Sequence, residues 1–197
     1  MAQALAEKLD AQSESTHSVG ADIRALRKSR SMTLIEFAAK LDRSVGFVSQ
    51  IERGISEPSI NDLRTIARIF DVPISLFFGE NKGDPDEARH IVRAGSRRSL
   101  GSSEGKLLEE LLSPDLGGSF EIVRSEFAAG AELLESQMRE TEESGYVIAG
   151  TFEIEISGKW YILQPGDSFR FVHEPHRWRN RQSEPAIVIW VISPPVY

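Results

Sequence analysis

The spacing of apolar residues changes once along this 197-residue chain, and that change most restricts the fold. Between Val19 and Phe78, apolar residues recur every three or four positions, which is the period of an amphipathic helix. From about His90 onward the period is two, in short runs separated by Gly, Pro and Asn, which is typical of strands. The two periods predict a multidomain α + β chain, with a helical bundle followed by a β-sandwich or small β-barrel.

Capping residues divide the first half into five short predicted helices. Thr33 and Ser59 each stand before an apolar run and have an acidic residue three positions on, the pattern of a capping box. Ser44 is placed to cap the helix between them, and Gly54 to end it. Pro73 opens a last short helical turn, "PISLFFG".

The connection between two of these helices is very short. Only "DRS" separates the helix that begins at Leu34 from the one that begins at Val45, so the two must cross steeply, as in a helix-turn-helix. The start of the second helix then faces outward. There Gln50 can pair with adenine, Val45 can touch a thymine methyl group, and backbone N–H groups can bind phosphate. The alternative is a helical bundle with a charged face that binds no DNA.

The stretch "TLIEFAAKLDRSVGFVSQIERGISEPSINDLRTIARIFDV" resembles the lambda-repressor-like helix-turn-helix family of XRE-type regulators, with similarity over about residues 19–79. The resemblance implies a five-helix bundle that binds a double-stranded DNA operator, and a structural ion pair between Arg27 and Glu52. It places Val45, Gly46 and Gln50 at base-facing positions with Ser49 beside them. The full set of expected DNA-contacting residues is Arg43, Ser44, Val45, Gly46, Ser49, Gln50 and Arg53.

The acidic balance of the chain does not oppose DNA binding by this half. The formal net charge is −7, but residues 19–80 carry 9 Lys and Arg against 8 Asp and Glu, whereas residues 81–197 carry 13 against 19. The predicted DNA-binding half is therefore nearly neutral. Two copies in a homodimer would add their phosphate contacts together.

The second half, "ESGYVIAGTFEIEISGKWYILQPGDSFRFVHEPHRWRN", resembles a cupin, a jelly-roll β-barrel, over about residues 120–195. Metal-binding cupins carry His-x-His before a Glu and a further His downstream. Glu143 and His176 match two of these four positions, but Gln137 and Arg139 occupy the other two. Because an arginine repels a divalent ion and two ligands are few, we expect neither a tightly held metal nor another cofactor. A weak metal site at Glu143 and His176 is the alternative.

We expect the barrel to bind a small-molecule effector instead, either anionic or amine-like. Arg139 can clamp a carboxylate or phosphate, or it can form an outward salt bridge with Glu140 or Glu142. Aromatic residues can wall the pocket or simply pack in the core. The pocket candidates are Gln137, Arg139, Glu143, Tyr146, Phe171, His176 and Trp178.

The predicted organisation is a flexible arm at 1–18, a DNA-binding domain at 19–79, a linker at 80–96 and a ligand-sensing, dimerising domain at 97–197. The linker segment at 79–89 is where a rearrangement would be transmitted. The segment "GKLLEELLS" near Leu107 fits a strand pair or a helical turn. Strands such as "AIVIWVIS" are apolar on both faces, which indicates a covered surface.

The predicted function is that of a cytoplasmic transcription regulator. The chain has no cysteine, no secretory signal and no run long enough for a membrane span. Neither a Gly-x-Ser-x-Gly elbow nor a phosphate-binding glycine loop is present, so we expect no enzymatic activity. The alternatives are a cupin oxygenase or isomerase with a DNA-binding domain, and a phage-type or toxin–antitoxin partner protein.

Overall fold

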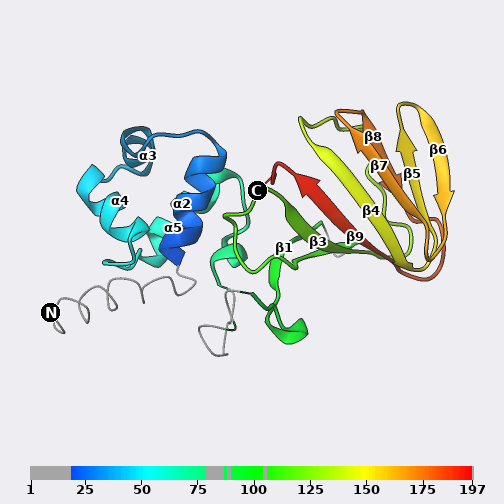
Figure 1. The fold of residues 1–197 in the computed structure, drawn as a ribbon, viewed down its shortest axis with the longest axis horizontal. Coiled ribbons are helices and arrows are strands. Elements are labelled where there is room, and N and C mark those ends of the chain that lie inside the picture. Colours follow the sequence, from blue (N-terminus) through cyan, green and yellow to red (C-terminus); the bar gives the residue numbers. More distant parts are fainter. Residues whose placement is uncertain (1–18, 79–86, 88–89, 104–105, 197) are drawn as a thin grey trace, which may run out of the picture.

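The computed structural model describes residues 19–78, 87, 90–103 and 106–196 (Figure 1). Within these residues, short helices precede two antiparallel sheets, in the order that the change of hydrophobic period predicts. The predicted arm at 1–18 and nearly all of the predicted linker segment at 79–89 lie outside the described residues. No helix in the described part of the chain is long and apolar enough to cross a bilayer.

Four α-helices and one 3₁₀ turn form the helical bundle. They are α2 (Val19–Ser29), α3 (Leu34–Leu41), α4 (Val45–Glu52), α5 (Ile60–Phe70) and the turn η1 (Ile74–Phe77). The fifth predicted helix, the short turn that Pro73 opens, is the 3₁₀ helix η1 and not an α-helix. The run after Pro73 is too short for a ladder of α-helical bonds, and the Leu76 N–H instead donates to the Pro73 carbonyl three residues back, at 3.0 Å.

The predicted caps are confirmed. Thr33 and Ser59 each accept a hydrogen bond from a backbone N–H three residues on, and the acidic side chain at that third position bonds back, which completes both capping boxes. The hydroxyl of Ser44 accepts from the Phe47 N–H at 3.1 Å. Gly54 follows the end of α4 with φ of +72°, a conformation that glycine adopts without strain.

Helices α2 and α4 approach so closely that only glycine fits between them. A Cβ added at Gly20 would lie 2.0 Å from the carbonyl oxygen of Ile51. Fully buried side chains from the helices pack into one core under this contact: Ile23, Leu26, Phe37, Val48, Ile51, Ile66 and Phe70. The position of α4 is therefore fixed by α2.

Nine strands follow a short 3₁₀ turn, η2 (Ala94–Ser96), and form two antiparallel sheets. The first sheet has the order β1-β2-β3-β9-β4-β7 and the second the order β6-β5-β8. The bounds are β1 (Arg98–Ser103), β2 (Leu107–Leu111), β3 (Glu121–Phe127), β4 (Glu142–Ala149), β5 (Phe152–Ile156), β6 (Lys159–Leu163), β7 (Ser168–Val172), β8 (His176–Arg179) and β9 (Ala186–Ser193).

The predicted strands all appear, and the segment near Leu107 is the strand β2. Alternate residues of the strands are buried, as in β3, where every second residue points inward. Buried side chains from both sheets share one core, to which Val123, Phe127, Val147, Phe152, Ile154, Val188 and Trp190 belong.

The edge of the larger sheet joins the helical bundle. Leu111 of β2 and Leu116 in the loop after it belong to the same buried apolar cluster as the helices. Figure 1 shows α4 at the opposite end of the bundle, away from the strands. The sheets therefore leave the outer side of α4 open.

Candidate functional sites

The start of α4 is exposed on the surface of the bundle. Val45 is 41% exposed although it is apolar, and Gly46 and Gln50 are also exposed. Ser49 is partly covered, because the guanidinium of Arg53 folds back and donates to its carbonyl at 3.1 Å. The buried face of α4 consists of Val48, Ile51 and Glu52. The side chains predicted to face DNA thus share the solvent side of one helix.

Two more of the predicted DNA-contacting side chains, besides Ser44 and Arg53, already have partners within the bundle. Arg43 pairs with Asp62 at 3.0 Å, although 46% of the arginine side chain remains exposed. The side-chain oxygen of Gln50 accepts from the Ser56 hydroxyl at 3.3 Å. The contact of Gln50 is exposed and weak enough to exchange for another polar partner. Asp62 is buried, so its pair with Arg43 is held more firmly than an exposed one.

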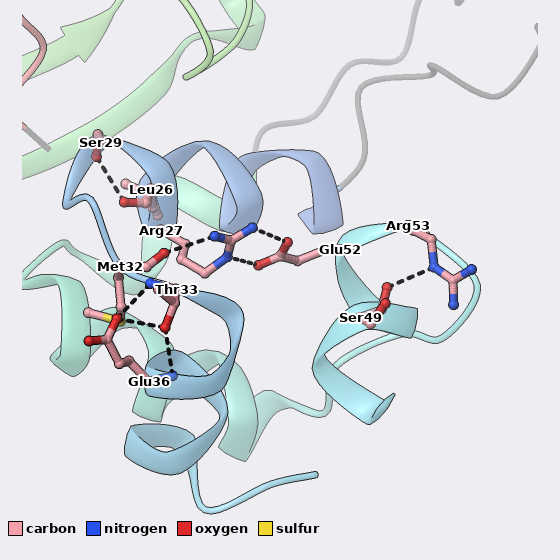
Figure 2. A network of polar contacts seen from close by, with 9 residues as sticks. All are labelled: Leu26, Arg27, Ser29, Met32, Thr33, Glu36, Ser49, Glu52 and Arg53. Carbon is pink, nitrogen blue, oxygen red and sulfur yellow. Dashed lines mark hydrogen bonds and ion pairs between the residues drawn. The ribbon is translucent and has the colours of Figure 1, made fainter. Parts of the chain in front are cut away.

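An ion pair fixes α4 to α2, as the resemblance implies. The Nε and a terminal nitrogen of Arg27 donate to the two carboxylate oxygens of Glu52 at 2.6 and 2.8 Å, and Figure 2 shows this paired geometry. A third bond runs from Arg27 to the Met32 carbonyl at 2.8 Å. Glu52 is buried, and its hydrogen bond raises the pKa of Arg27. The ion pair orients α4, and the side chains of Arg27 and Glu52 are not available to contact bases.

The strand domain contains a cavity of about 170 Å³ between its sheets. Five of the seven predicted pocket residues line it: Gln137, Arg139, Glu143, His176 and Trp178. Sequence analysis missed the wall formed by Leu107 and Glu109 of β2, Phe127 of β3 and Trp190 of β9. Alternation within each strand could have selected these residues, but only after the pairing of β2 with β3 and of β3 with β9 was known.

Tyr146 does not belong to the cavity, so its prediction as a pocket residue is wrong. Along β4 the residues Glu143, Gly145 and Val147 are buried, and Tyr146 lies on the opposite face with 48% of its surface exposed. Phe171 is buried but does not line the cavity. Its ring packs against the imidazole of His176 with the centroids 4.5 Å apart, so it supports that ring from behind.

A chain of hydrogen bonds connects three of the cavity residues. Arg139 donates to the side-chain oxygen of Gln137 at 3.2 Å, which turns the amide nitrogen of Gln137 toward Nε2 of His176, also at 3.2 Å. On the other side of the ring, Nδ1 lies 3.1 Å from the Glu174 carbonyl. A carbonyl can only accept, so Nδ1 carries the proton and the Nε2 lone pair accepts from Gln137.

This arrangement does not fit a divalent metal. The lone pair with which His176 would bind a metal is taken by the Gln137 amide, and a guanidinium stands behind that amide. Within residues 19–78, 87, 90–103 and 106–196, no three His, Cys, Asp or Glu side chains are grouped to hold a metal ion. The outward salt bridge suggested for Arg139 is wrong as well, because Arg139 lines the cavity and donates to Gln137. The two acidic residues suggested as its partners have other neighbours: Glu142 pairs with Arg170 at 2.6 Å, and Glu140 lies 3.6 Å from Nδ1 of His173.

Carboxylates outnumber arginine around the cavity. Glu109 and Glu143 line it, and Glu121 lies near enough for its pKa to respond to Glu109, Glu143 and Arg139. Burial raises the pKa of Glu109 and raises that of Glu121 to about 7. One oxygen of Glu143 accepts from the Thr141 hydroxyl at 2.8 Å, and the other is 3.9 Å from His176 Nε2. The carboxyl groups of the cavity thus lie against aromatic walls, and burial favours the neutral forms of Glu109 and Glu121.

Comparisons with known proteins agree with this division of the chain. A family model described as helix-turn-helix matches residues 23–77, and one described as a cupin domain matches residues 123–192. The HTH-type transcriptional regulator SutR of Escherichia coli is 28% identical over 80% of this chain and 84% of its own length. The HTH-type transcriptional regulator PuuR of the same organism is 22% identical over 76% of this chain and 80% of its own.

The chain is also similar to solved structures. The crystal structure of an HTH_3 family transcriptional regulator from Vibrio cholerae is 23% identical, covers 90% of this chain and 95% of its own, and has a TM-score of 0.42.

Proposed function

We propose that this chain, which belongs to the helix-turn-helix regulators that carry a cupin domain, binds DNA sequence-specifically and regulates transcription in response to a small molecule. The observation that supports this most is the exposed start of α4 at the end of the bundle away from the sheets. A helix presented in this way can enter the major groove without moving the rest of the bundle.

The proposed contacts divide by chemistry. The bases are faced by Val45, Gly46 and Gln50, with Ser49 beside them. The methyl groups of Val45 can contact a thymine methyl group, and the amide of Gln50 can pair with an adenine edge. Gly46 leaves room for the backbone to approach, since a Cβ added there would meet only the Ser44 hydroxyl, at 4.0 Å. The backbone phosphates would be contacted by the hydroxyl or guanidinium groups of Ser44, Arg43 and Arg53.

A homodimer is part of the proposal. The outer face of the larger sheet exposes an apolar group from β4, β7 and β9, formed by Tyr146, Ile148, Val172 and Val191. A second copy of the chain would cover this face and present two α4 helices to half-sites about 34–36 Å apart. On this reading residues 19–79 bind DNA and residues 97–197 bind the effector and form the dimer.

The cavity is the proposed effector site. Arg139 suits a carboxylate or phosphate group, but it stands among Glu109, Glu121 and Glu143. A purely anionic molecule would offer these carboxyl groups no positive charge, whereas a cation would favour their ionised forms. A molecule with an ammonium group, alone or together with a carboxylate, is the better fit, because Trp178 and Trp190 can also stabilise a cation at their ring faces. Mass spectrometry of small molecules released from protein isolated from its own host tests this directly.

The DNA-binding part is tested with a randomised duplex pool. The affinities of the selected duplexes are then measured for the wild-type protein, for Gln50→Ala and for the control Gln182→Ala. The control alters an exposed glutamine of the strand domain. Gln50→Ala should weaken the preferred sequence by about 1–3 kcal/mol and relax one base position. If Gln50→Ala lowers the affinity for all sequences equally, Gln50 does not contact a base specifically. Failure to enrich any sequence would refute the function.

Catalysis is not part of the proposal. A cupin oxygenase needs a metal that activates its substrate, and the hydrogen bond between Gln137 and His176 occupies the ligand nitrogen. A metal-dependent turnover of any substrate by the purified protein would favour the enzyme alternative instead.

A further inference from the structure

The first two strands belong to the cavity and to the helical core at the same time. Along β2, the side chains of Leu107, Glu109 and Leu111 point to one face because a strand alternates with a period of two. Leu107 and Glu109 line the cavity. Leu111 is buried in the apolar cluster of the helical bundle, with only 1% of its surface exposed. One short strand therefore lines the proposed effector cavity and also packs into the core of the helical bundle.

The neighbouring strand β1 is joined to α2 by a buried ion pair. A terminal nitrogen of Arg98 donates to Asp22 at 2.8 Å, and both residues are buried. A second polar contact lies beside it, where the Ser75 hydroxyl of η1 donates to the Ser99 carbonyl at 3.0 Å. Removal of one member of a buried pair leaves an uncompensated charge, so this contact holds the sheet and the bundle in one relative position.

From α2 the contacts continue to the proposed recognition helix. Gly20 lies against the Ile51 carbonyl so closely that no side chain fits, and Arg27 grips Glu52 with two hydrogen bonds (Figure 2). Asp22 is on the same helix, between these two positions. A displacement of β1 therefore reaches α4 through one rigid helix, without passing through the segment at 79–89.

We propose that Asp22 and Arg98 are positioning residues, which couple the state of the cavity to the orientation of α4 through the hairpin β1–β2. The inference rests on the proposed function, since it takes α4 as the DNA-binding helix and the cavity as the effector site. The coupling is reciprocal: a change in the cavity alters the affinity for DNA, and bound DNA alters the cavity. The second direction can be measured without knowledge of the effector.

The chain carries its own reporters for that measurement. Its three tryptophans, Trp160, Trp178 and Trp190, all lie in the strand domain, and two of them line the cavity. The helical bundle has none. Tryptophan emission therefore reports the cavity, whereas the fluorescence anisotropy of a dye-labelled duplex reports binding at α4.

The experiment titrates the full-length protein with a labelled duplex taken from the in vitro selection. In the wild type, DNA binding should shift tryptophan emission. Arg98→Ala should still bind the duplex, within about threefold of wild-type affinity, but lose most of the shift. Arg98→Lys keeps the charge and should restore much of it. The matched control is Arg97→Ala, which breaks a 3.0 Å ion pair with Glu110 in the same hairpin and should keep the full shift.

The outcomes are distinct. If the wild type does not bind DNA by anisotropy, the proposed function fails, and the inference falls with it. If DNA binds but the wild-type emission does not change, or if Arg98→Ala keeps the full shift, the coupling role is overturned while the proposed function stands. If Arg98→Ala does not fold, the double variant Asp22→Asn/Arg98→Gln replaces it, because it removes both charges and leaves no lone buried charge.

Discussion

Ionisation of Glu121 should make the strand domain less stable as the pH rises toward neutrality. Glu121 is 2% exposed, and burial raises the pKa of its carboxyl group to about 7 from an ordinary 4.5. The Val196 N–H bond and Arg139 lower that pKa, but Glu109 and Glu143 raise it further. Because the folded state holds this proton more tightly than the unfolded chain, the stabilisation is complete below pH 4.5 and is lost as the pH rises through 7.

The magnitude follows from the size of the shift. A difference of 2.5 between the folded and unfolded pKa values corresponds to about 3 kcal/mol over the whole range. Between pH 6 and pH 8.5, where the chain is kept above its isoelectric point of about 5.2, the expected fall in unfolding free energy is about 1.4 kcal/mol.

Urea unfolding followed by tryptophan emission measures this quantity in the strand domain, where all three tryptophans lie. Glu121→Gln keeps the oxygen that accepts from Val196 and should remove that part of the pH dependence. Glu126→Gln is the matched control, since Glu126 lies on the outer face of the same strand and pairs with Arg124. If Glu121→Gln and wild type lose stability in parallel over this range, the reasoning about the buried carboxyl group is refuted.

Two further changes test other parts of the structure. The double variant Gln137→His/Arg139→His should create a four-ligand set with Glu143 and His176 and should bind Zn²⁺ in equilibrium dialysis. The wild type and the control Met138→His, which alters an outward-facing residue, should not bind it. If the double variant binds no Zn²⁺, our account of why this cavity does not fit a metal is contradicted. Val191→Asp should dissociate the proposed dimer in sedimentation equilibrium, whereas Leu134→Asp, at an exposed loop position, should not. An unchanged mass for the Val191 variant would place the interface elsewhere.

Local chemistry made the elements of the fold predictable. The caps at Thr33, Ser44 and Ser59 need only four consecutive positions, and the strands follow from alternation within each run. The same alternation could have placed Tyr146 correctly. It lies three positions after Glu143, an odd number, so the two side chains must point to opposite faces of one regular strand.

Long-range pairing made the rest unpredictable. Glu109 lines the cavity, and Glu121 lies near its charged groups, only because β2 pairs with β3 and β3 with β9, and nothing in either local sequence states that order. The pair of Asp22 and Arg98 joins residues 76 positions apart across two different kinds of structure. From its sequence context, Leu111 is expected to point into the core between the sheets, yet it packs in the apolar cluster of the helical bundle. These are the contacts that join the two halves.

The loss of the metal and the charge of the cavity have a common physical basis. In a metal-binding cupin the cation balances the buried carboxylate and organises the imidazole. Here Gln137 takes over the second task, since its amide holds His176 by a hydrogen bond. Arg139 supplies part of the balancing positive charge, but it is a single cation near three carboxyl groups, those of Glu109, Glu121 and Glu143. Burial favours the neutral forms of Glu109 and Glu121, and a cationic ligand would favour their ionised forms. On this argument, the residues that stand in place of the two metal-binding histidines would make the proposed effector site selective for a ligand that carries a positive charge.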